Sequence, residues 1–213
     1  MLRVRQAVAR DLVAGLSWHA VFDKLRAQGP AIWASLPLVE RARFLRHLRA
    51  LWDVHRFRIA PQTLTTNAGM HQSGQLSYLA GRITGVRLGN PLDLRVTLRT
   101  SRETVPVLAD RVILATGPAH GSVIDTQPAF SDLAFLGLVQ ADPLRLGIHT
   151  AADGHAVPVT ASAADGFVLV AGPLARGTIG ELMGVPEVIT WAEQIARTAV
   201  AQIRRRKASV AAE

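Results

Sequence analysis

Two strongly apolar runs that each end in Gly-Pro constrain the fold of this chain more than any other feature. The first is Arg111–Thr116, followed by Gly117-Pro118, and the second is Phe167–Ala171, followed by Gly172-Pro173. Each run predicts a β-strand that is buried on both faces, because the apolar residues do not alternate with polar ones. A glycine at the end of a strand lets the backbone pass close to a flat ligand. Open α/β sheets hold nucleotides at such strand ends.

The usual companion of such strands is absent from the sequence. No apolar run is followed by Gly-x-Gly-x-x-Gly, the turn that grips the pyrophosphate of a dinucleotide at a helix N-terminus. We therefore expect the chain to supply part of a nucleotide-binding protein rather than all of it. The matching ends of the two runs further predict that strands 111–116 and 167–171 lie close together in one sheet.

Composition excludes several classes of protein. The chain has 213 residues, of which 49% are apolar and 19% charged, and it contains no cysteine. Disulfides, thiolate metal sites and cysteine nucleophiles are therefore excluded, and a reducing, cytoplasmic location is expected. The longest apolar runs are about eight residues, too short to span a bilayer, so we expect no membrane partner.

The net charge of +8 comes almost entirely from arginine. The excess is concentrated between Arg41 and Arg58 and again at Arg204–Lys207. Three interpretations are open: a solvated basic surface, a site for the phosphates of a cofactor or substrate, and a nucleic-acid surface. The chain has one tyrosine and six phenylalanines and no RNA-reading motif, so we expect no nucleic-acid partner.

The hydrophobic period changes near residue 75 from helical to alternating. We expect a helical segment over residues 1–73 and an α/β region over residues 74–213, together forming one compact unit. The expected strands are 76–80, 82–88, 94–98, 105–108, 111–116 and 167–171. The expected helices of the second region are 131–138 and 186–206, and the latter carries an apolar face at helical spacing.

Two arginines of the N-terminal region fall inside the apolar stripe of their helix. Arg49 and Arg56 lie on the face that packs inward rather than opposite it. Either Arg49 pairs with Asp53, one helical turn away, and orients the helix, or the face binds an anionic ligand. Arg49, His55 and Arg56 are the candidates for binding a substrate or cofactor charge. The histidines show no metal-ligand spacing, so no metal site is expected, and no catalytic residue is assigned.

Three ordered blocks of the sequence resemble the C-terminal half of bacterial FAD/NAD(P)-binding proteins that have two dinucleotide-binding motifs. The first block is an arginine- and tryptophan-rich helix, and the second is a strand that ends in Ala-Thr-Gly-Pro. The third opens the final helix. The matching residues are Arg43–Arg49 and Trp52–Arg56 with Ala60-Pro61, then Ala115–Pro118, then Gly172–Gly177 with Glu181 and Val185–Glu187.

This resemblance implies an α/β fold in which a helical segment precedes a partial, Rossmann-like FAD/NAD(P)-binding sheet with a β-hairpin excursion and a C-terminal helix. It implies FAD and NAD(P) as cofactors of an oxidoreductase, with this chain on the side of the flavin ring. The cofactor-binding residues that it implies are Ala115, Thr116, Gly117, Pro118, Gly172, Pro173, Gly177 and Pro186. The competing hypotheses are a non-enzymatic basic binding or assembly module and a remnant that binds no cofactor.

Two departures from the family pattern shape what we expect of the chain by itself. Related flavoproteins have Gly-Asp where Gly172-Pro173 stands, so a carboxylate that binds the ribityl chain is missing. The glycine-rich βαβ unit is missing as well. We therefore expect the chain alone to bind FAD weakly or not at all. We expect it to associate with a separately encoded N-terminal half or with another copy of itself.

Overall fold

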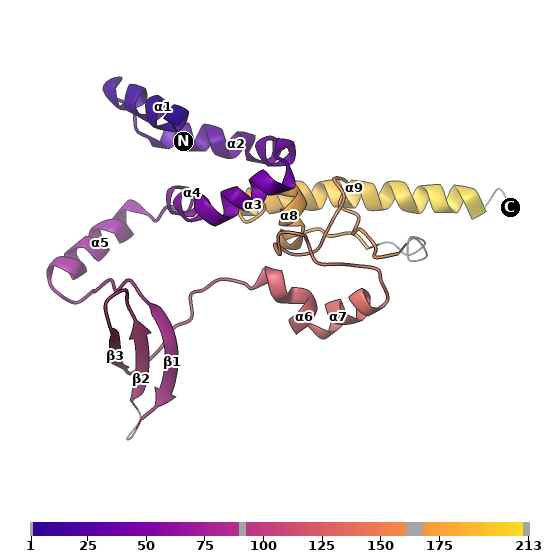
Figure 1. Ribbon diagram of the computed structural model, residues 1–213. Coiled ribbons are helices and arrows are strands. Elements are labelled where there is room, and N and C mark those ends of the chain that lie inside the picture. Colours follow the sequence, from indigo (N-terminus) through magenta and orange to yellow (C-terminus); the bar gives the residue numbers. More distant parts are fainter. Residues whose placement is uncertain (1, 90–92, 161–167, 211–213) are drawn as a thin grey trace. The chain divides into compact units, whose positions relative to one another are not determined.

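The computed structural model describes residues 2–89, 93–160 and 168–210 and shows a mixed α/β protein (Figure 1). The chain forms two compact units. Unit 1 joins two distant segments, Met1–Phe57 and Ala119–Glu213, and unit 2 is the continuous segment Arg58–Pro118. The division expected at residue 73 therefore differs from the observed one. Within the described ranges, no helix is long and apolar enough to cross a membrane.

The first segment of unit 1 is helical, as the sequence predicts. Its helices are α1 (Leu2–Val13), α2 (His19–Ser35), α3 (Leu38–His47) and α4 (Arg49–Arg56). The helical stretch is interrupted at Leu48, whose φ of −120° ends α3 and begins α4. In contrast, α2 continues through Pro30, although proline disfavours a helix interior. The indole of Trp33 is buried and anchored to a distant segment, so tertiary packing outweighs the cost of proline in the helix.

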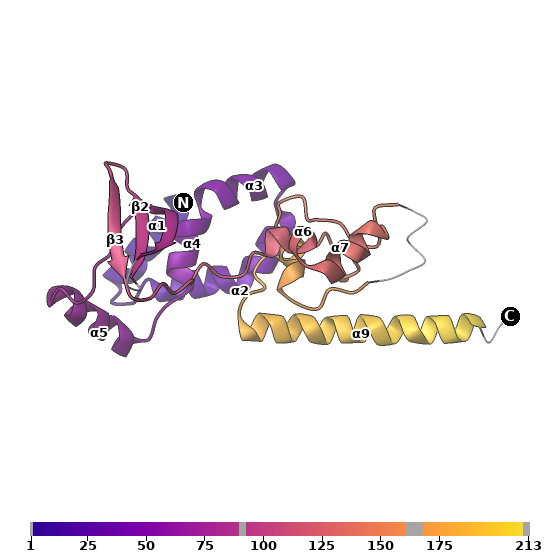
Figure 2. The ribbon, with the colours of Figure 1, turned by 90° about the horizontal axis from the view of Figure 1, so that it is seen from below.

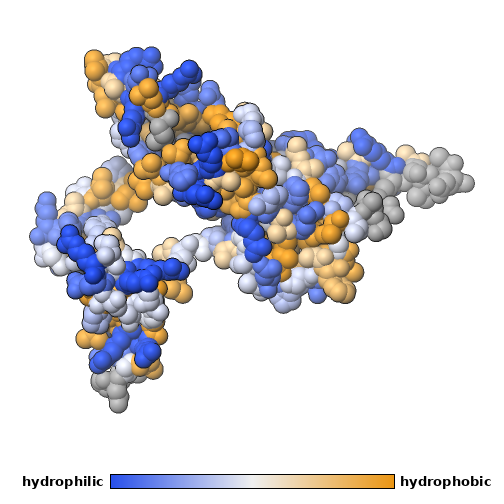
Figure 3. All heavy atoms as spheres, in the orientation of Figure 1, coloured by the Kyte–Doolittle hydropathy of each residue, from blue (hydrophilic) through white to orange (hydrophobic). Residues whose placement is uncertain are grey.

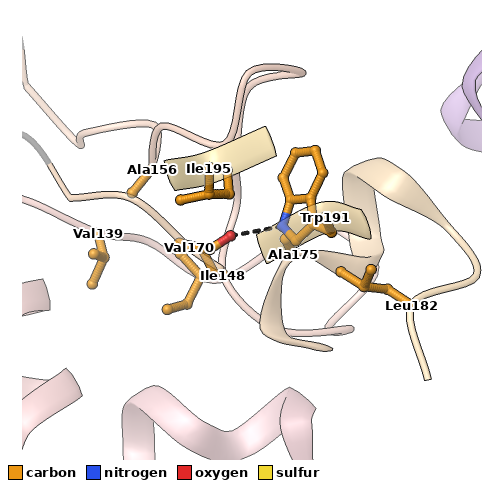
Figure 4. Packing of buried hydrophobic residues seen from close by; sticks show 8 residues of the cluster. All are labelled: Val139, Ile148, Ala156, Val170, Ala175, Leu182, Trp191 and Ile195. Atoms are coloured by element: carbon orange, nitrogen blue, oxygen red, sulfur yellow. Dashed lines mark hydrogen bonds between the residues drawn. The ribbon is translucent and has the colours of Figure 1, made fainter. Parts of the chain in front are cut away.

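The second segment of unit 1 contains the main hydrophobic core. Its short helices are α6 (Val123–Thr126), α7 (Pro128–Phe135) and α8 (Arg176–Ile179), and the chain closes with α9 (Val185–Val210). Figure 2 shows α9 as one continuous helix, in agreement with the predicted apolar spacing. Figure 4 shows the core, in which Trp191 of α9 donates a hydrogen bond to the carbonyl of Val170 at 2.8 Å. The core residues are Val139, Ile148, Ala156, Val170, Ala175, Leu182, Trp191 and Ile195.

The second apolar run is partly buried and does not form a regular strand over the residues that the structure describes. Val170 is 7% exposed, and Leu169 makes one isolated antiparallel bridge to His155. Phe167, the first residue of this run, lies outside the described ranges. The run packs against α9 through the Trp191 hydrogen bond, and its backbone meets a bend of the chain rather than a long neighbouring strand. Full burial was therefore predicted correctly only for Val170, and no regular strand forms.

Unit 2 consists of helix α5 (Pro61–Gln72) and a three-stranded antiparallel meander. The strands β1 (Arg82–Leu88), β2 (Leu94–Arg99) and β3 (Thr104–Ala109) pair in the order β1-β2-β3, and their positions agree with three of the predicted strands. Directly paired residues share a face, and one face is wholly apolar. We call it the apolar sheet face: Ile83, Val86, Leu88, Leu94, Val96, Leu98, Val105, Val107 and Ala109.

The prediction of a buried strand at residues 111–116 is wrong. These residues make no strand pairing, and the side chains of Ile113 and Leu114 are 87% and 80% exposed. The meander ends at Ala109, and a strand requires a neighbour to accept and donate its backbone hydrogen bonds. Residues 76–80 likewise make no strand. In the described ranges the only sheet is the antiparallel meander.

Candidate functional site

Unit 1 contains a cavity of about 860 Å³, which we call the unit 1 cavity. Its walls come from α1, α2, α3, α4 and the stretch from Arg176 to Met183, so both segments of unit 1 contribute. Most of the lining side chains are apolar, and Figure 3 shows apolar side chains at the surface of the part formed by α1–α4. A cavity of this size is in the range that holds a small molecule or a cofactor.

Aromatic rings form one wall of the unit 1 cavity. The Phe22 ring of α2 stacks on the His55 ring of α4, with ring centroids 4.5 Å apart and planes 8° apart. Trp18 meets His55 edge to face at 5.3 Å, and Trp52 lies 6.3 Å from Phe22. Four rings therefore meet, because the start of α2 and Trp18, the residue just before it, lie against α4. Such a wall offers a large apolar area with few rotatable bonds to fix on binding.

Ion pairs compensate both carboxylates of the cavity wall. The Arg49 Nε lies 3.5 Å from an Asp53 carboxylate oxygen, as the spacing along the helix predicts. Both side chains are nearly half exposed, so the pair is a surface one rather than part of the core. Glu181 lies 3.3 Å from the Nε of Arg56 and accepts a hydrogen bond from the Trp52 indole at 3.0 Å.

Arg56, which the sequence predicts to bind a ligand charge, is largely buried and engaged by two glutamates, and its assignment to a ligand stays a prediction. Its side chain is 10% exposed and lies between Glu181 and Glu187, 3.8 Å from the latter. Arg26 also donates hydrogen bonds to Glu187. Burial alone would raise the pKa of Glu187, but hydrogen bonding and the two arginines lower it below the ordinary value. Arg56 is thereby neutralised and fixes the start of α9 to α4.

Arg176 differs from the other basic residues of the cavity wall. Its side chain is partly buried, and its Nη1 donates to the thioether sulfur of Met183 at 3.4 Å in a contact that solvent reaches. Burial lowers its pKa, and repulsion by Arg49 lowers it further, whereas Asp53 and Glu181 act in the opposite direction. No carboxylate of the described residues lies within salt-bridge distance of Arg176. A cationic group in an apolar wall therefore keeps most of its hydrogen-bond donors free.

The pKa of His120 is affected by the same positive charges. Its imidazole pKa is lowered first by burial and then by the charges of Arg176 and Arg49. The Nδ1 atom is buried and has no hydrogen-bond partner among the described residues. A negative charge placed beside Arg176 would offset the repulsion and raise the pKa of His120.

The predicted cofactor-binding residues of unit 1 differ in their burial and in the space around them. Gly172 is half-buried and extended, and a Cβ placed on it would meet nothing within 4 Å, so a flat ligand could approach there. Pro173 begins the 3₁₀ turn Pro173–Ala175 that leads into α8 and to Arg176. Gly177 is buried instead, and a Cβ there would collide with the carboxylate of Asp142. Pro186 is exposed in the first turn of α9.

The other predicted cofactor residues belong to unit 2. Ala115, Thr116, Gly117 and Pro118 are all exposed. Gly117 has a φ of +74°, a conformation that favours glycine. Their assignment to a cofactor site stays a prediction.

The cavity joins Arg49 and His55 with residues that the sequence reasoning did not single out. Arg176 was visible inside the block Gly172–Gly177, where a lone arginine follows an apolar turn, but its lack of an acid partner depends on distant contacts. Within the described ranges, no group of three potential ligands surrounds a metal position. Comparison with family models, curated proteins and solved structures finds no match to this chain.

Proposed function

We propose that this chain supplies the flavin-ring side of the cofactor site in an FAD/NAD(P)-dependent oxidoreductase. The observation that carries the proposal is the unit 1 cavity, which is apolar, walled by aromatic rings and bordered at Arg176 by the block Gly172–Gly177. The resemblance assigns that block to the flavin ring. A reducing cytoplasm is the compartment proposed, on the absence of cysteine.

The residues present fit a flavin ring better than they fit the rest of the cofactor. The rings of Phe22, His55 and Trp52 provide an apolar surface on which a flat aromatic ring can pack. The open space over Gly172 lets a ligand come close to the backbone of that residue. The described residues show no glycine-rich turn for a pyrophosphate. FAD, when bound, would carry electrons between a nicotinamide and the substrate, while the protein binds and orients it.

A Rossmann-like sheet, completed by a separately encoded glycine-rich half, is part of the proposal. Its support is the segment 111–116, which is strongly apolar, runs without strand pairing and exposes Ile113 and Leu114. Exposed apolar residues in sequence mark a surface that a partner covers. A neighbouring parallel strand from the other half would pair this segment and bury both side chains.

Titration with lumiflavin, which is the ring alone, and with FAD tests the proposal. Saturable but weak quenching of flavin fluorescence is expected, with the same dissociation constant for both ligands, because this chain holds the ring and not the pyrophosphate. Phe22→Leu should weaken both about fivefold, since stacking contributes roughly 1 kcal/mol. The control is Phe135→Leu, because Phe135 is 91% exposed and lies outside the cavity wall. Absence of saturable lumiflavin binding would contradict the proposal.

The apolar sheet face of unit 2 favours a second function, that of an assembly module. Ile83, Val86 and Leu88 of β1 are 52%, 47% and 71% exposed on it. Arg87, Arg95 and Arg99 lie on the opposite face, so two copies that meet through the apolar face keep these like charges apart. Val86→Lys should then convert a concentration-dependent dimer to a monomer in sedimentation, and Thr97→Lys on the opposite face should not. A wild-type monomer at all concentrations would exclude this self-association.

A further inference from the structure

Among the charged residues that line the unit 1 cavity, one partly buried cation has no carboxylate partner. The charged lining residues are Arg5, Arg49, Asp53, Arg176 and Glu181. Asp53 is paired with Arg49 at 3.5 Å, and Glu181 is paired with Arg56 at 3.3 Å. Arg5 is exposed on α1, where water solvates it. Arg176 alone among these lining residues combines partial burial with the lack of a carboxylate partner.

The donors of Arg176 are underused for a guanidinium in an apolar wall. A guanidinium has five N–H donors, and the thioether of Met183 is a weak acceptor for one of them. The neighbouring Arg49 repels rather than satisfies it. A buried or half-buried charge is costly without a hydrogen-bonded counter-charge, and fields act more strongly next to apolar walls than in water. The missing counter-charge therefore points to a ligand.

We propose that the unit 1 cavity binds an apolar monocarboxylate whose carboxylate pairs with Arg176 and whose apolar body lies against the Phe22 and Trp52 wall. A carboxylate matches the planar fork of a guanidinium with two parallel hydrogen bonds. A neutral ligand would leave Arg176 unpaired, and a cation would be repelled. A dianionic phosphate would bring two charges into an apolar wall that offers one uncompensated, half-buried arginine.

The carboxylate ligand would be the substrate of the proposed oxidoreductase, and in that role the inference rests on the proposed function, because the reaction requires a bound flavin. The binding step itself requires no flavin. The two can therefore be tested separately on the same protein.

Displacement of the neutral fluorescent dye N-phenyl-1-naphthylamine from the full chain tests the site. Decanoate, decanol and decylammonium carry the same alkyl body and differ in charge. Decanoate should displace the dye at concentrations at least roughly tenfold lower than decanol, because hydrogen bonds to charged groups contribute that much. Decylammonium should be the weakest of the three.

Arg176→Met should remove the advantage of decanoate while leaving dye binding and displacement by decanol unchanged. Arg43→Met is the matched control, because Arg43 is exposed, pairs with Glu40 and lies outside the cavity wall. Equal displacement by decanoate and decanol in the wild type would overturn the inference. Failure of the dye to bind, or an advantage that survives in Arg176→Met, would overturn it as well.

A measurement on the wild-type chain keeps the inference testable if Arg176→Met does not fold. Decanoate should raise the pKa of His120 in an NMR titration, because its carboxylate offsets the charges of Arg176 and Arg49 that face this imidazole. Decanol should leave the pKa of His120 unchanged, and an identical pKa with both ligands would contradict the inference.

The flavin proposal and the carboxylate proposal can fail independently. If lumiflavin does not bind but decanoate keeps its advantage over decanol, the proposed flavin function fails and the carboxylate site stands. The reverse result would leave the flavin and remove the carboxylate site.

Discussion

Trp33 of α2 donates a hydrogen bond from its indole Nε1 to the carbonyl oxygen of Gly177 at 2.8 Å, across 144 positions of sequence. The same carbonyl accepts a second hydrogen bond from Arg41 at 3.3 Å, and the Arg41 guanidinium lies over the Trp33 ring at 5.3 Å. This contact joins the two segments of unit 1 at the wall of the cavity and fixes the residue that follows Arg176.

Trp33→Phe should therefore loosen the cavity wall without removing its apolar character. The change deletes one buried hydrogen bond, but Arg41 still satisfies the Gly177 carbonyl, so the free energy of unfolding should fall by about 1–2 kcal/mol. Urea unfolding followed by circular dichroism measures this. The affinity for the dye should fall in parallel. Trp18→Phe removes the same indole group from a residue that is less buried than Trp33, and it should lower the free energy of unfolding by less.

Gly172 and Gly177 should respond in opposite ways to a larger side chain. Gly177→Ala places a methyl group against Asp142, which is 4% exposed and accepts hydrogen bonds from the backbone of Leu144 and Leu146. The free energy of unfolding should fall by about 1–3 kcal/mol. Gly172→Val occupies open space in an extended conformation that any residue adopts, so stability should be nearly unchanged. Equal loss of stability in both variants would contradict these assignments.

The two arginines of α4 provide a second matched pair. Arg56→Met leaves Glu181 and Glu187 partly buried with fewer counter-charges, and loss of one partner of such a buried network costs about 3 kcal/mol or more. Arg49→Met breaks an ion pair whose side chains are 43% and 41% exposed, which costs at most about 1 kcal/mol. Thermal and urea unfolding of both variants should give this order, and the opposite order would show that Arg49 is the structural residue.

His155 should make the stability of unit 1 depend on pH. The hydrogen bond from its Nε2 to Gln202 at 2.7 Å raises the imidazole pKa above its ordinary value of 6.5, against an opposing effect of burial. Asp153, 3.0 Å from Nδ1, raises it further. A raised folded-state pKa stabilises the fold fully below pH 6.5, and this contribution is lost as the pH rises through the folded-state pKa.

His155→Gln should accordingly remove a fall in the free energy of unfolding that the wild type shows as the pH rises above 6.5. The difference between the two proteins isolates this contribution from that of His120, whose lowered pKa has the opposite sign. His47→Gln, a change at an exposed position of α3, should retain the fall. A wild-type profile parallel to that of His155→Gln would show that the Gln202 contact is absent in solution.

Local patterns predicted the parts of the fold that local interactions determine. Alternation of apolar and charged residues placed β2, because Val96 and Leu98 are buried while Arg95 and Arg99 are exposed. Helical spacing placed α9 in the same way. The prediction of a buried strand at Arg111–Thr116 was wrong because an apolar run indicates that a segment favours burial but does not identify the segment that packs against it.

The candidate site shows the same limit. The Arg49–Asp53 pair followed from positions four residues apart. In contrast, the ion pair of Arg56 with Glu181 and the repulsion between Arg176 and Arg49 each join residues more than a hundred positions apart. No local pattern distinguishes an arginine between two distant glutamates from one that faces a thioether. Spatial neighbours, rather than residue type, decide which arginine is available to a ligand.

The discontinuity of unit 1 has a consequence for synthesis on the ribosome. All of unit 2 and then the second segment, from Ala119 at least through Gly177, must be translated before α2 can meet Gly177. At about 5–20 residues per second, α1–α4 wait for several seconds with their apolar faces uncovered, whereas each hairpin of the meander closes on its own neighbours. The chain should therefore depend on a chaperone that binds the nascent N-terminal helices, and ribosome-bound chains arrested near residue 118 should be its strongest substrates.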